Sequence, residues 1–426
     1  MDTKYEAMWT SLGLDLDAHA QLLGVLGGAY EGIFLSQKNR PEGMKYFDFV
    51  MSEVHGLRIQ ELMDAKAAGR KVIGSYCTFV PEEITLAANG VHVGLCSGAE
   101  FATDKVETLL PRNTCSLIKS ALGFKLGKVC PYVEACDLIV GENTCDGKKK
   151  AYETFKELMP NFYIMDLPQM KSEAGRALLK VEYLRFMKKI EELTGETIDA
   201  DKLRHGIEIA NNKRAALMRF NAARAASPVP ISGLDGLLAN QVFFYDDPVR
   251  FTASVNALAD ELEERARAKN GVADAKAPRI LISGCPMAVP NWKLPWVIES
   301  TGAVIVGEES CVGARGIRNE VKADGASVDS LIDAIVDRYF QIDCAIFTPN
   351  DDRLRHIEEM YRDLKADGVI HYCLQFCQPY QMEAMGVERE LQKKGIPVLR
   401  IDTDYSMEDV EQLRTRVEAF TEQIAK

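Results

Sequence analysis

Short runs of apolar residues recur in two parts of this sequence, and segments with helical periodicity separate them. Apolar runs of this length between helices are typical of strands that are buried on both faces of a parallel sheet. The pattern therefore predicts an α/β fold with two doubly wound parallel sheets. The predicted strands of the first sheet are 71–76, 91–95, 138–140 and 162–165, and those of the second are 279–284, 303–307, 344–347, 368–376 and 398–401.

Helical periodicity marks most of the chain outside these runs. Two long helices, broken at Thr194-Gly195, are expected between 171 and 226. The segment 227–250, with its prolines, glycines and Phe243-Phe244-Tyr245, is expected to be a loop that is anchored in the core and lines a pocket. The predicted organisation is an N-terminal helical segment (1–65), a first α/β domain (66–170), a helical connection with the pocket loop (171–275) and a second α/β domain with a C-terminal helix (276–426).

Composition narrows the classes of partner. With 426 residues, of which 47% are hydrophobic and 27% charged, the chain can form two or three domains with sizeable cores. Its net charge, 51 − 63 = −12, disfavours nucleic acid, because phosphate binding needs a basic face. No apolar run approaches the roughly 20 residues that span a bilayer, and the first residues lack the pattern of a secretory signal. We expect a cytoplasmic protein without nucleic-acid or membrane partners.

Eleven cysteines are many for a cytoplasmic chain, where disulfides are rare. Cys145 follows the buried run 138–140 and precedes a helix that is expected to begin near Lys149. Open α/β sheets bind ligands at such points, because backbone N–H groups and the helix dipole converge there. A thiol in this place, beside three lysines, is expected to ionise easily, and the thiolate is the form that binds metal. Comparable places, at strand ends or in neighbouring loops, hold Cys77, Cys115, Cys130, Cys285, Cys311 and Cys377.

The competing interpretation is that the cysteines are small buried side chains of the core. It suits Cys136 and Cys344, at the start of or inside apolar runs, and also Cys96. If two α/β domains face each other across a cleft, however, the thiols at the strand ends converge there, which favours a redox or metal site. No close pair of CxxC motifs indicates zinc. Dispersed thiolates that meet in a dry cleft suit an iron–sulfur cluster.

Nucleotide and hydrolase motifs are absent from the sequence. Residues 141–148 have one residue too many for a phosphate-binding loop and lack the following Ser or Thr. No GxGxxG follows a predicted strand, and neither HExxH nor GxSxG occurs. We therefore expect that this chain binds no nucleotide, and that His92, His205 and His371 are structural.

Several segments together resemble one known family. They are NTCSLIKSALGF, KVCPY, DLIVGENTCDGKKKAYE, EESCVGARG, HYCLQFCQPY and IDTDYSMEDVEQLRTRVEAF. They are similar to the 2-hydroxyacyl-CoA dehydratase and benzoyl-CoA reductase family, and in particular to its branch of anaerobic double-cubane-cluster reductases, from about residue 65 to the end. The resemblance implies an iron–sulfur cluster between two α/β domains. It also implies a separate ATP-hydrolysing iron–sulfur activator that injects a low-potential electron.

The resemblance also implies a set of cluster ligands. Cys115, Cys145 and Cys377 match the three thiolates that hold a single cubane, [4Fe-4S], throughout the family. A second cubane, which would make a double-cubane [8Fe-9S] cluster, needs three more thiolates. Cys77, Cys130 and Cys311 are chosen for this set because each lies in a loop at a strand end, and Cys285, Cys344 and Cys373 are reserves.

Charged residues near these cysteines have two interpretations each. Lys148, Lys149 and Arg315 would offset the negative charge of a sulfide-rich cluster, or they are solvated helix residues. Glu82 and Glu83 fit the first turn of a helix. Glu82 also lies close enough to Cys77 in the sequence to be a candidate proton donor, and it is the single catalytic candidate among the side chains.

Three functions are consistent with this sequence. The first is a cytoplasmic reductase, acting as a homodimer with a double-cubane cluster, that uses activator-derived electrons to reduce a small, hard-to-reduce substrate. The second is a 2-hydroxyacyl-CoA dehydratase subunit with one cubane, which eliminates water through a ketyl radical. The third is an iron–sulfur electron carrier with no substrate of its own. Extra cysteine ligands favour the first function, and no segment indicates coenzyme A binding.

Overall fold

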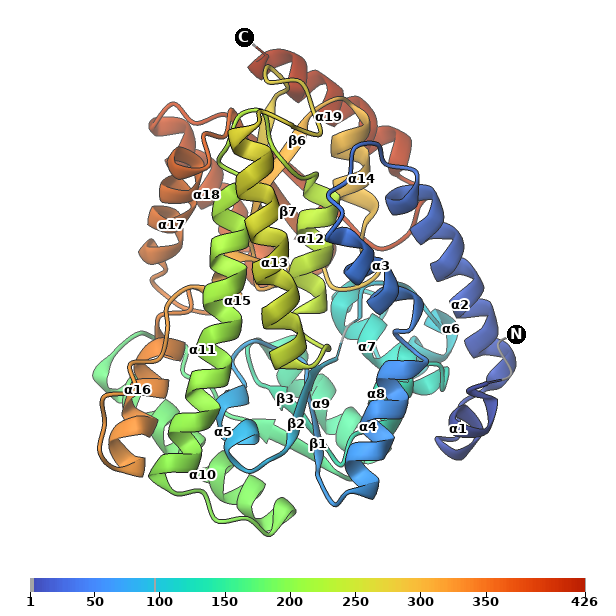
Figure 1. Ribbon diagram of the computed structural model, residues 1–426, viewed down its shortest axis with the longest axis vertical. Helices are drawn as coiled ribbons and strands as arrows, with labels where there is room; N and C mark the ends of the chain where they lie inside the picture. Colours follow the sequence, from blue (N-terminus) through green and yellow to red (C-terminus); the bar gives the residue numbers. More distant parts are fainter. Residues whose placement is uncertain (1–3, 96, 426) are drawn as a thin grey trace.

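The computed structural model describes residues 4–95 and 97–425 and contains two parallel four-stranded sheets. The predicted fold class is confirmed, because helices flank both sheets. The first sheet lies in the lower half of Figure 1 and the second sheet in the upper half. The first sheet contains β1 (Val72–Ser75), β2 (Val91–Gly94), β3 (Leu138–Glu142) and β4 (Phe162–Met165), and the second contains β5 (Arg279–Gly284), β6 (Val304–Glu309), β7 (Gly368–Leu374) and β8 (Val398–Thr403).

The two sheets have the same topology. Their strand orders are β2-β1-β3-β4 and β6-β5-β7-β8, so in each sheet the chain begins at an inner strand, adds an edge strand and then crosses to the other side. The register places Gly74 of β1 beside Ile139 of β3, and Ile282 of β5 beside Ile370 of β7. The direction of winding reverses between these neighbouring strands, and ligands bind outside the carboxyl ends of strands at such reversals. Each sheet therefore offers one such binding point.

The described residues before β4 form ten helices, and some of these also contact later elements. Tyr30 and Phe34 pack on Trp292, and the helix Met44–Ser52 contacts the helix Gly233–Val242. Asp15 caps the helix Leu16–Tyr30 with its side chain, which accepts a hydrogen bond from the backbone N–H of Ala18 at 3.1 Å. In chain order these helices are α1 (Glu6–Ser11), α2 (Leu16–Tyr30), the π-helix η1 (Glu31–Leu35), α3 (Met44–Ser52), α4 (Leu57–Ala67), α5 (Glu82–Ala87), α6 (Thr103–Val106), α7 (Ser116–Leu126), α8 (Pro131–Ala135) and α9 (Asp146–Leu158).

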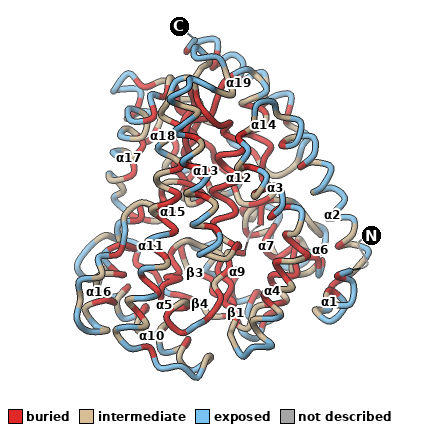
Figure 2. The backbone as a smooth tube through the Cα atoms, viewed as in Figure 1, coloured by how far each residue is buried: buried red, intermediate tan, exposed pale blue. Residues whose placement is uncertain are grey.

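Four helices connect the two sheets: α10 (Glu173–Thr194), α11 (Ala200–Ala223), α12 (Gly233–Val242) and α13 (Pro248–Arg267). The predicted break is confirmed, because α10 ends at Thr194 and Gly195 follows with a left-handed φ of 75°. The expectation of a loop over 227–250 is wrong in part. Ser232 caps α12, and every residue of this helix is buried between neighbouring elements, as the colouring of Figure 2 shows.

The second half of the chain adds α14 (Lys293–Ser300), α15 (Ala314–Ile317), α16 (Val328–Phe340), α17 (Asp351–Asp363), α18 (Gln378–Lys393) and α19 (Val410–Ile424). Of these, α16 crosses to the first sheet: Leu331 and Ile335 join the hydrophobic cluster that contains Ile73 and Val140. In Figure 1, α16 lies beside α10 in the lower half. Within the described residues no helix is long and apolar enough to cross a membrane.

The strand expected at 344–347 is wrong. This segment forms turns, and the backbone N–H of Phe347 donates to the carbonyl oxygen of Cys344 at 3.1 Å. The side-chain amide of Asn350 also donates to that carbonyl, at 3.1 Å. These local bonds satisfy backbone groups that a sheet would otherwise pair. The apolar run therefore packs in the hydrophobic cluster that contains Ile73 and Val140 of the first sheet, and it lines a cavity instead of forming a strand.

The carboxylate of Glu299 binds the N-terminus of α12. We expect this contact to make the free energy of unfolding depend on pH. The carboxylate accepts backbone N–H bonds from Gly233 at 2.6 Å, Leu234 at 3.3 Å and Ile305 at 3.1 Å. Burial raises the pKa of Glu299 from 4.5 to about 7, and these N–H donors lower it only in part. Between these two values the folded chain holds a proton that the unfolded chain releases, so stability falls as pH rises.

In the wild-type protein the free energy of unfolding should fall by roughly 2 kcal/mol over this pH range, as expected for a half-buried carboxylate. We expect the Glu299→Gln variant to lack this fall. The measurement is urea unfolding of both proteins at pH 4.5 and pH 7. An equal loss of stability in both proteins across this range would contradict the assignment to Glu299.

Candidate metal centre

A cavity of about 990 Å³ lies between the carboxyl ends of the two sheets. Residues that follow β1, β3, β5, β6 and β7 all reach it, so both binding points of the fold open into one space. Among the described residues, seven cysteines line it: Cys77, Cys115, Cys145, Cys285, Cys311, Cys344 and Cys377. Five of them belong to the six predicted ligands and two are reserves. Cys96 lies outside the described residues.

Cys115, Cys145 and Cys377 share one structural feature, since each is the N-cap residue of a helix. They precede α7, α9 and α18, whose N-termini therefore meet at the cavity. Backbone N–H groups and helix dipoles at these ends favour negatively charged ligands. In the thiol state Cys115 and Cys377 are hydrogen-bonded to each other. The three predicted ligands of the first cubane thus lie around one end of the cavity.

Cys145 begins α9 more directly than the sequence indicated. The helix starts at Asp146, and the Cys145 Sγ accepts a hydrogen bond from the backbone N–H of Lys148 at 3.5 Å. The structure contradicts the expectation that this thiol ionises easily, because its pKa is raised above the ordinary value. Burial raises the pKa of Cys145, and the Lys148 N–H and ammonium offset that effect only in part.

A second group of thiols, Cys77, Cys311 and Cys344, also lines the cavity. Cys77 donates a hydrogen bond to Cys311, which raises the pKa of Cys77 and lowers that of Cys311 to about 6. The Arg315 guanidinium also favours the Cys311 thiolate, with Nη1 at 3.6 Å from Sγ. Burial raises the pKa of Cys344, which lies near Cys311, to about 11. Cys344 comes from the segment for which a strand was expected.

Cys285 lies at the end of β5 and is closely associated with the first group. Its Sγ accepts the backbone N–H of Leu374 at 3.3 Å, and its thiol is hydrogen-bonded to Cys377. Only 1% of Cys285 is exposed. The cavity therefore presents more thiols at this end than a cubane with three cysteine ligands needs.

Three other cysteines do not line the cavity. Cys130, one of the six predicted ligands, is the buried N-cap of the five-residue helix α8 and belongs to the hydrophobic core. Cys136 donates to the carbonyl of Tyr132 at 3.1 Å and packs so closely on β1 that a Cβ at Gly74 would lie 2.6 Å from its sulfur. Cys373, inside β7, donates to the carbonyl of Tyr380 at 3.4 Å. The structure thus gives Cys130 and Cys136 core positions.

Of the three predicted cations, Arg315 is buried and Lys148 is half-buried, and both lie near the thiols. Lys148 lines the cavity and is ion-paired with Glu142, which also accepts a hydrogen bond from Tyr152 at 3.3 Å. Arg315 is 1% exposed and is paired with a buried glutamate. Lys149 is exposed and does not line the cavity. The interpretation as a solvated helix residue therefore suits Lys149 alone.

Glu82 is buried in the first turn of α5, away from the residues that line the cavity. It is ion-paired with Lys213 of α11. Burial raises the pKa of Glu82, but the charges of Lys213 and Arg214 outweigh this effect, so the pKa is lowered. Its position and its ion pair favour the structural interpretation over that of a proton donor.

Aromatic residues complete the lining. The expectation that the segment with Phe243-Phe244-Tyr245 lines a pocket is confirmed for Phe244 and Tyr245, whereas three tyrosines of the lining were not singled out from the sequence. They are Tyr76, Tyr152 and Tyr380: Tyr152 donates to Glu142, the partner of Lys148, and Tyr380 contacts the Cys311 end. Two of them could have been found by proximity, since Tyr76 precedes Cys77 and Tyr380 follows Cys377 by three residues. Gln241, at the end of α12, reaches the cavity only through the long-range packing of that helix.

The chemistry of this lining fits an iron–sulfur cluster. Within residues 4–95 and 97–425, no three His, Cys, Asp or Glu side chains are close enough to hold a single metal ion. The thiols instead surround a space large enough for a polynuclear group, and cysteine thiolates are the ligands that hold iron–sulfur clusters. The first group and the second group could each bind one part of such a cluster.

Comparison with known proteins identifies a single family. The family model for the 2-hydroxyglutaryl-CoA dehydratase D-component matches residues 77–424. The matched region contains both sheets except for β1, which precedes it, and it contains all seven lining cysteines.

Individual relatives include both dehydratases and a reductase. The chain is 40% identical to YjiM of Escherichia coli strain K12, provisionally named a dehydratase subunit, over 88% of this chain and 96% of YjiM. It is 26% identical to the (R)-phenyllactyl-CoA dehydratase beta subunit of Clostridium sporogenes, over 89% of this chain and 98% of that protein. It is 22% identical to one of the subunits of benzoyl-CoA reductase from Thauera aromatica, over 83% of this chain and 91% of that protein.

Proposed function

The chain belongs to the 2-hydroxyglutaryl-CoA dehydratase D-component family, and from this premise we propose that it is a reductase with a double-cubane cluster in the cysteine-lined cavity. Its electrons come from a separate ATP-hydrolysing iron–sulfur activator protein. Its substrate is a small molecule that is hard to reduce. When bound, the cluster supplies low-potential electrons, and the chain holds the cluster and excludes water from it.

The observation that carries this proposal is the number and grouping of the thiols. Two groups of three suit two cubanes: Cys115, Cys145 and Cys377 for the first, and Cys77, Cys311 and Cys344 for the second. Cys344 replaces Cys130 in this assignment because Cys130 lies in the core. Cys285 remains beside the first group as a reserve. A single cubane would leave the second group of thiols without a role.

A second observation favours a small substrate over a coenzyme A thioester. The phosphates of coenzyme A need cationic partners. Among the described lining residues the cations are Lys148 and Lys150, which are ion-paired with Glu142 and Glu153. The names of the dehydratase relatives nevertheless support a second candidate, a 2-hydroxyacyl-CoA dehydratase subunit with a single [4Fe-4S] cluster. A non-catalytic electron carrier is the third, although tyrosines that line open space beside the thiols favour a substrate site.

The proposed setting follows from this function. We infer a cytoplasmic, oxygen-sensitive homodimer. Its activator is a separate protein that binds to it and is not part of this chain. The dehydratase and reductase relatives are named as subunits, so assembly with other chains is expected for those proteins. The sequence contains no nucleotide motif, and ATP hydrolysis is therefore assigned to the activator.

The test is the iron and acid-labile sulfide content of protein purified without oxygen. We expect two cubanes' worth of iron per chain, because the cavity presents two groups of thiols. One cubane's worth would support the dehydratase subunit and would call for a search for its partner chain. No iron in protein never exposed to air would overturn the cluster and leave the cysteines as core residues.

A further inference from the structure

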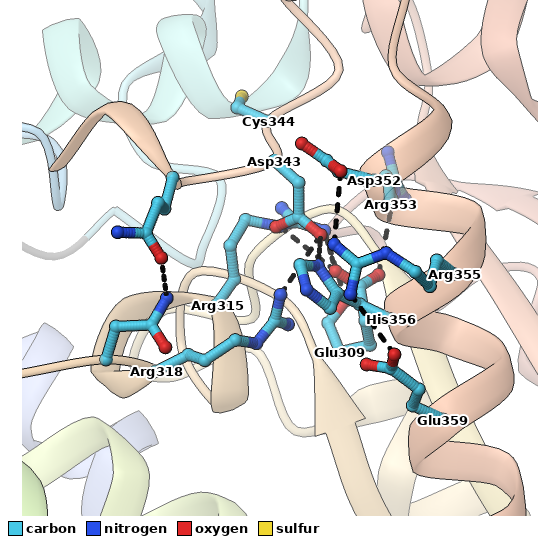
Figure 3. A network of polar contacts seen from close by, with 12 residues as sticks. Glu309, Arg315, Arg318, Asp343, Cys344, Asp352, Arg353, Arg355, His356 and Glu359 are labelled. Carbon is cyan, nitrogen blue, oxygen red and sulfur yellow. Dashed lines mark hydrogen bonds and ion pairs between the residues drawn. The ribbon is translucent and has the colours of Figure 1, made fainter. Parts of the chain in front are cut away.

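A network of buried charges lies against one end of the cavity. Figure 3 shows its members converging from β6, α15, α17 and the segment before Cys344. Its central cation is Arg315, whose Nε and Nη2 are 3.1 and 2.7 Å from the Glu309 carboxylate. Arg353 approaches the same carboxylate at 3.5 Å, and Asp343 lies 3.6 Å from the Arg315 Nε. These side chains are fully buried.

Arg315 has one terminal nitrogen that does not bind Glu309, and this nitrogen faces the thiols. Its Nη1 lies 3.6 Å from the Cys311 Sγ and donates to the hydroxyl of Tyr380. The same hydroxyl is 3.8 Å from the Cys344 Sγ. Two thiols of the second group are thus connected to one guanidinium, directly or through one phenol.

The other end of the cavity is built differently. There the Sγ of Cys145 and that of Cys285 accept backbone N–H groups, at 3.5 and 3.3 Å. Lys148 lies near thiols of both groups, since its charge acts on Cys145 and on Cys77, and its ammonium is ion-paired with Glu142. The two groups of thiols therefore have unequal contacts: the Arg315 guanidinium contacts the Cys311 sulfur directly, whereas neutral backbone amides donate to the sulfurs of Cys145 and Cys285.

We propose that Arg315, with Tyr380, makes the Cys311 end of the cavity the end at which an added electron is more stable. The inference rests on the proposed function. Hydrogen bonds to cluster sulfurs and nearby charge set the reduction potential of an iron–sulfur centre. A buried guanidinium in contact with a sulfur stabilises the additional negative charge of the reduced state, because charge-assisted hydrogen bonds are strong where water is excluded.

The electron comes from the reduced activator, which is oxidised in the same transfer, and no bond in this chain forms or breaks. Arg315 therefore acts through its positive charge, which stabilises the reduced state at the Cys311 end. It does not bind the substrate in this proposal. The two sheets have the same strand order, but the two groups of thiols at their carboxyl ends differ in their charged contacts.

The experiment is a reductive titration of the anaerobically purified holoprotein, followed by absorbance and electron paramagnetic resonance. We expect two separate one-electron reductions in the wild-type protein. The Arg315→Gln variant should lower the higher potential by at least about 59 mV, which is tenfold in the equilibrium constant of a one-electron couple, and leave the lower potential unchanged. Arg315→Lys should restore most of the difference, because it keeps the charge.

Arg338→Gln is the matched control. Arg338 is also fully buried and donates to the carbonyls of Gly316 and Asn319, next to Arg315, but no thiol is among its contacts. Its replacement should leave both potentials unchanged if Arg315 acts through charge. Tyr380→Phe removes one hydroxyl only, and should shift the higher potential in the same direction by a smaller amount. If Arg315→Gln protein fails to fold or to bind the cluster, the Tyr380→Phe variant provides the test instead.

The outcomes separate this inference from the function on which it rests. Variants with full iron content in which both potentials move together, or neither moves, would overturn the role of Arg315 and leave the proposed function intact. Wild-type protein without iron would overturn the proposed function itself. A shift in Arg338→Gln as large as in Arg315→Gln would assign the effect to the folding of α15 and would also overturn the inference.

Discussion

Cys145→Ala protein is expected to lose the iron of one cubane and all substrate reduction. Cys145 is the N-cap of α9 and contributes its sulfur to the first group of thiols. Alanine cannot ligate iron, and the remaining thiols of that group would hold the cubane with one ligand too few. The measurements are iron and sulfide content, the absorbance spectrum, and reduction assayed with the activator and ATP.

A second pair of variants decides between two ligand sets. The sequence predicts Cys130 as a ligand of the second cubane, whereas the cavity is lined by Cys344. We expect Cys344→Ala to lose iron and Cys130→Ala to keep it, with at most a small loss of stability from the core. Full iron content in Cys344→Ala together with depleted iron in Cys130→Ala would restore the ligand set that was predicted from the sequence.

Cys136→Ala controls for the loss of any cysteine. Cys136 packs against β1 and does not line the cavity. This variant should have the iron content of the wild-type protein. If it also lost iron, loss in Cys145→Ala would reflect a disturbed fold.

The strands of both sheets could be predicted because each is a short apolar run between helices. Their carboxyl ends could also be predicted, and parallel strands bring these ends to one edge of a sheet. The convergence of Cys77, Cys145, Cys285, Cys311 and Cys377 on one cavity follows from these two facts. The sequence alone could not establish that the two sheets face one another.

The segment 344–347 shows why the remaining site was harder to predict. Its four residues are as apolar as a strand, but Asn350 and the local turn satisfy its backbone, and its neighbours α16 and α17 lie against different sheets. Apolar character records burial and does not distinguish a strand from a buried loop. The apolar run therefore favoured a core position for Cys344, which remained only a reserve ligand of the second cubane.

Contacts between charged or polar residues that are far apart in the chain also could not be predicted from the sequence. Arg315 meets Tyr380, 65 residues away, and Lys213 meets Glu82, 131 residues away. No local pattern links such partners, since their approach depends on how the helices pack. Residues that act near their own strand end could be found, and residues brought in from distant helices could not.

Arg224→Ala is expected to cause a large loss of stability, although Arg224 does not line the cavity. Arg224, which follows α11, binds Glu308 of β6 through two bonds of 2.6 and 2.8 Å, and both side chains are fully buried. Removing one partner leaves an uncompensated buried charge, which costs about 3–5 kcal/mol. The free energy of unfolding in urea should fall by that amount.

Arg219→Ala is the control within the same helix. Arg219 is ion-paired with Asp260 and Glu263 at the surface, where such pairs contribute about 1 kcal/mol or less. The double variant Arg224→Met with Glu308→Leu should recover much of the lost stability, because no charge remains unpaired. If the double variant were as unstable as Arg224→Ala, the loss would come from packing between α11 and β6, and the buried charge would not be its cause.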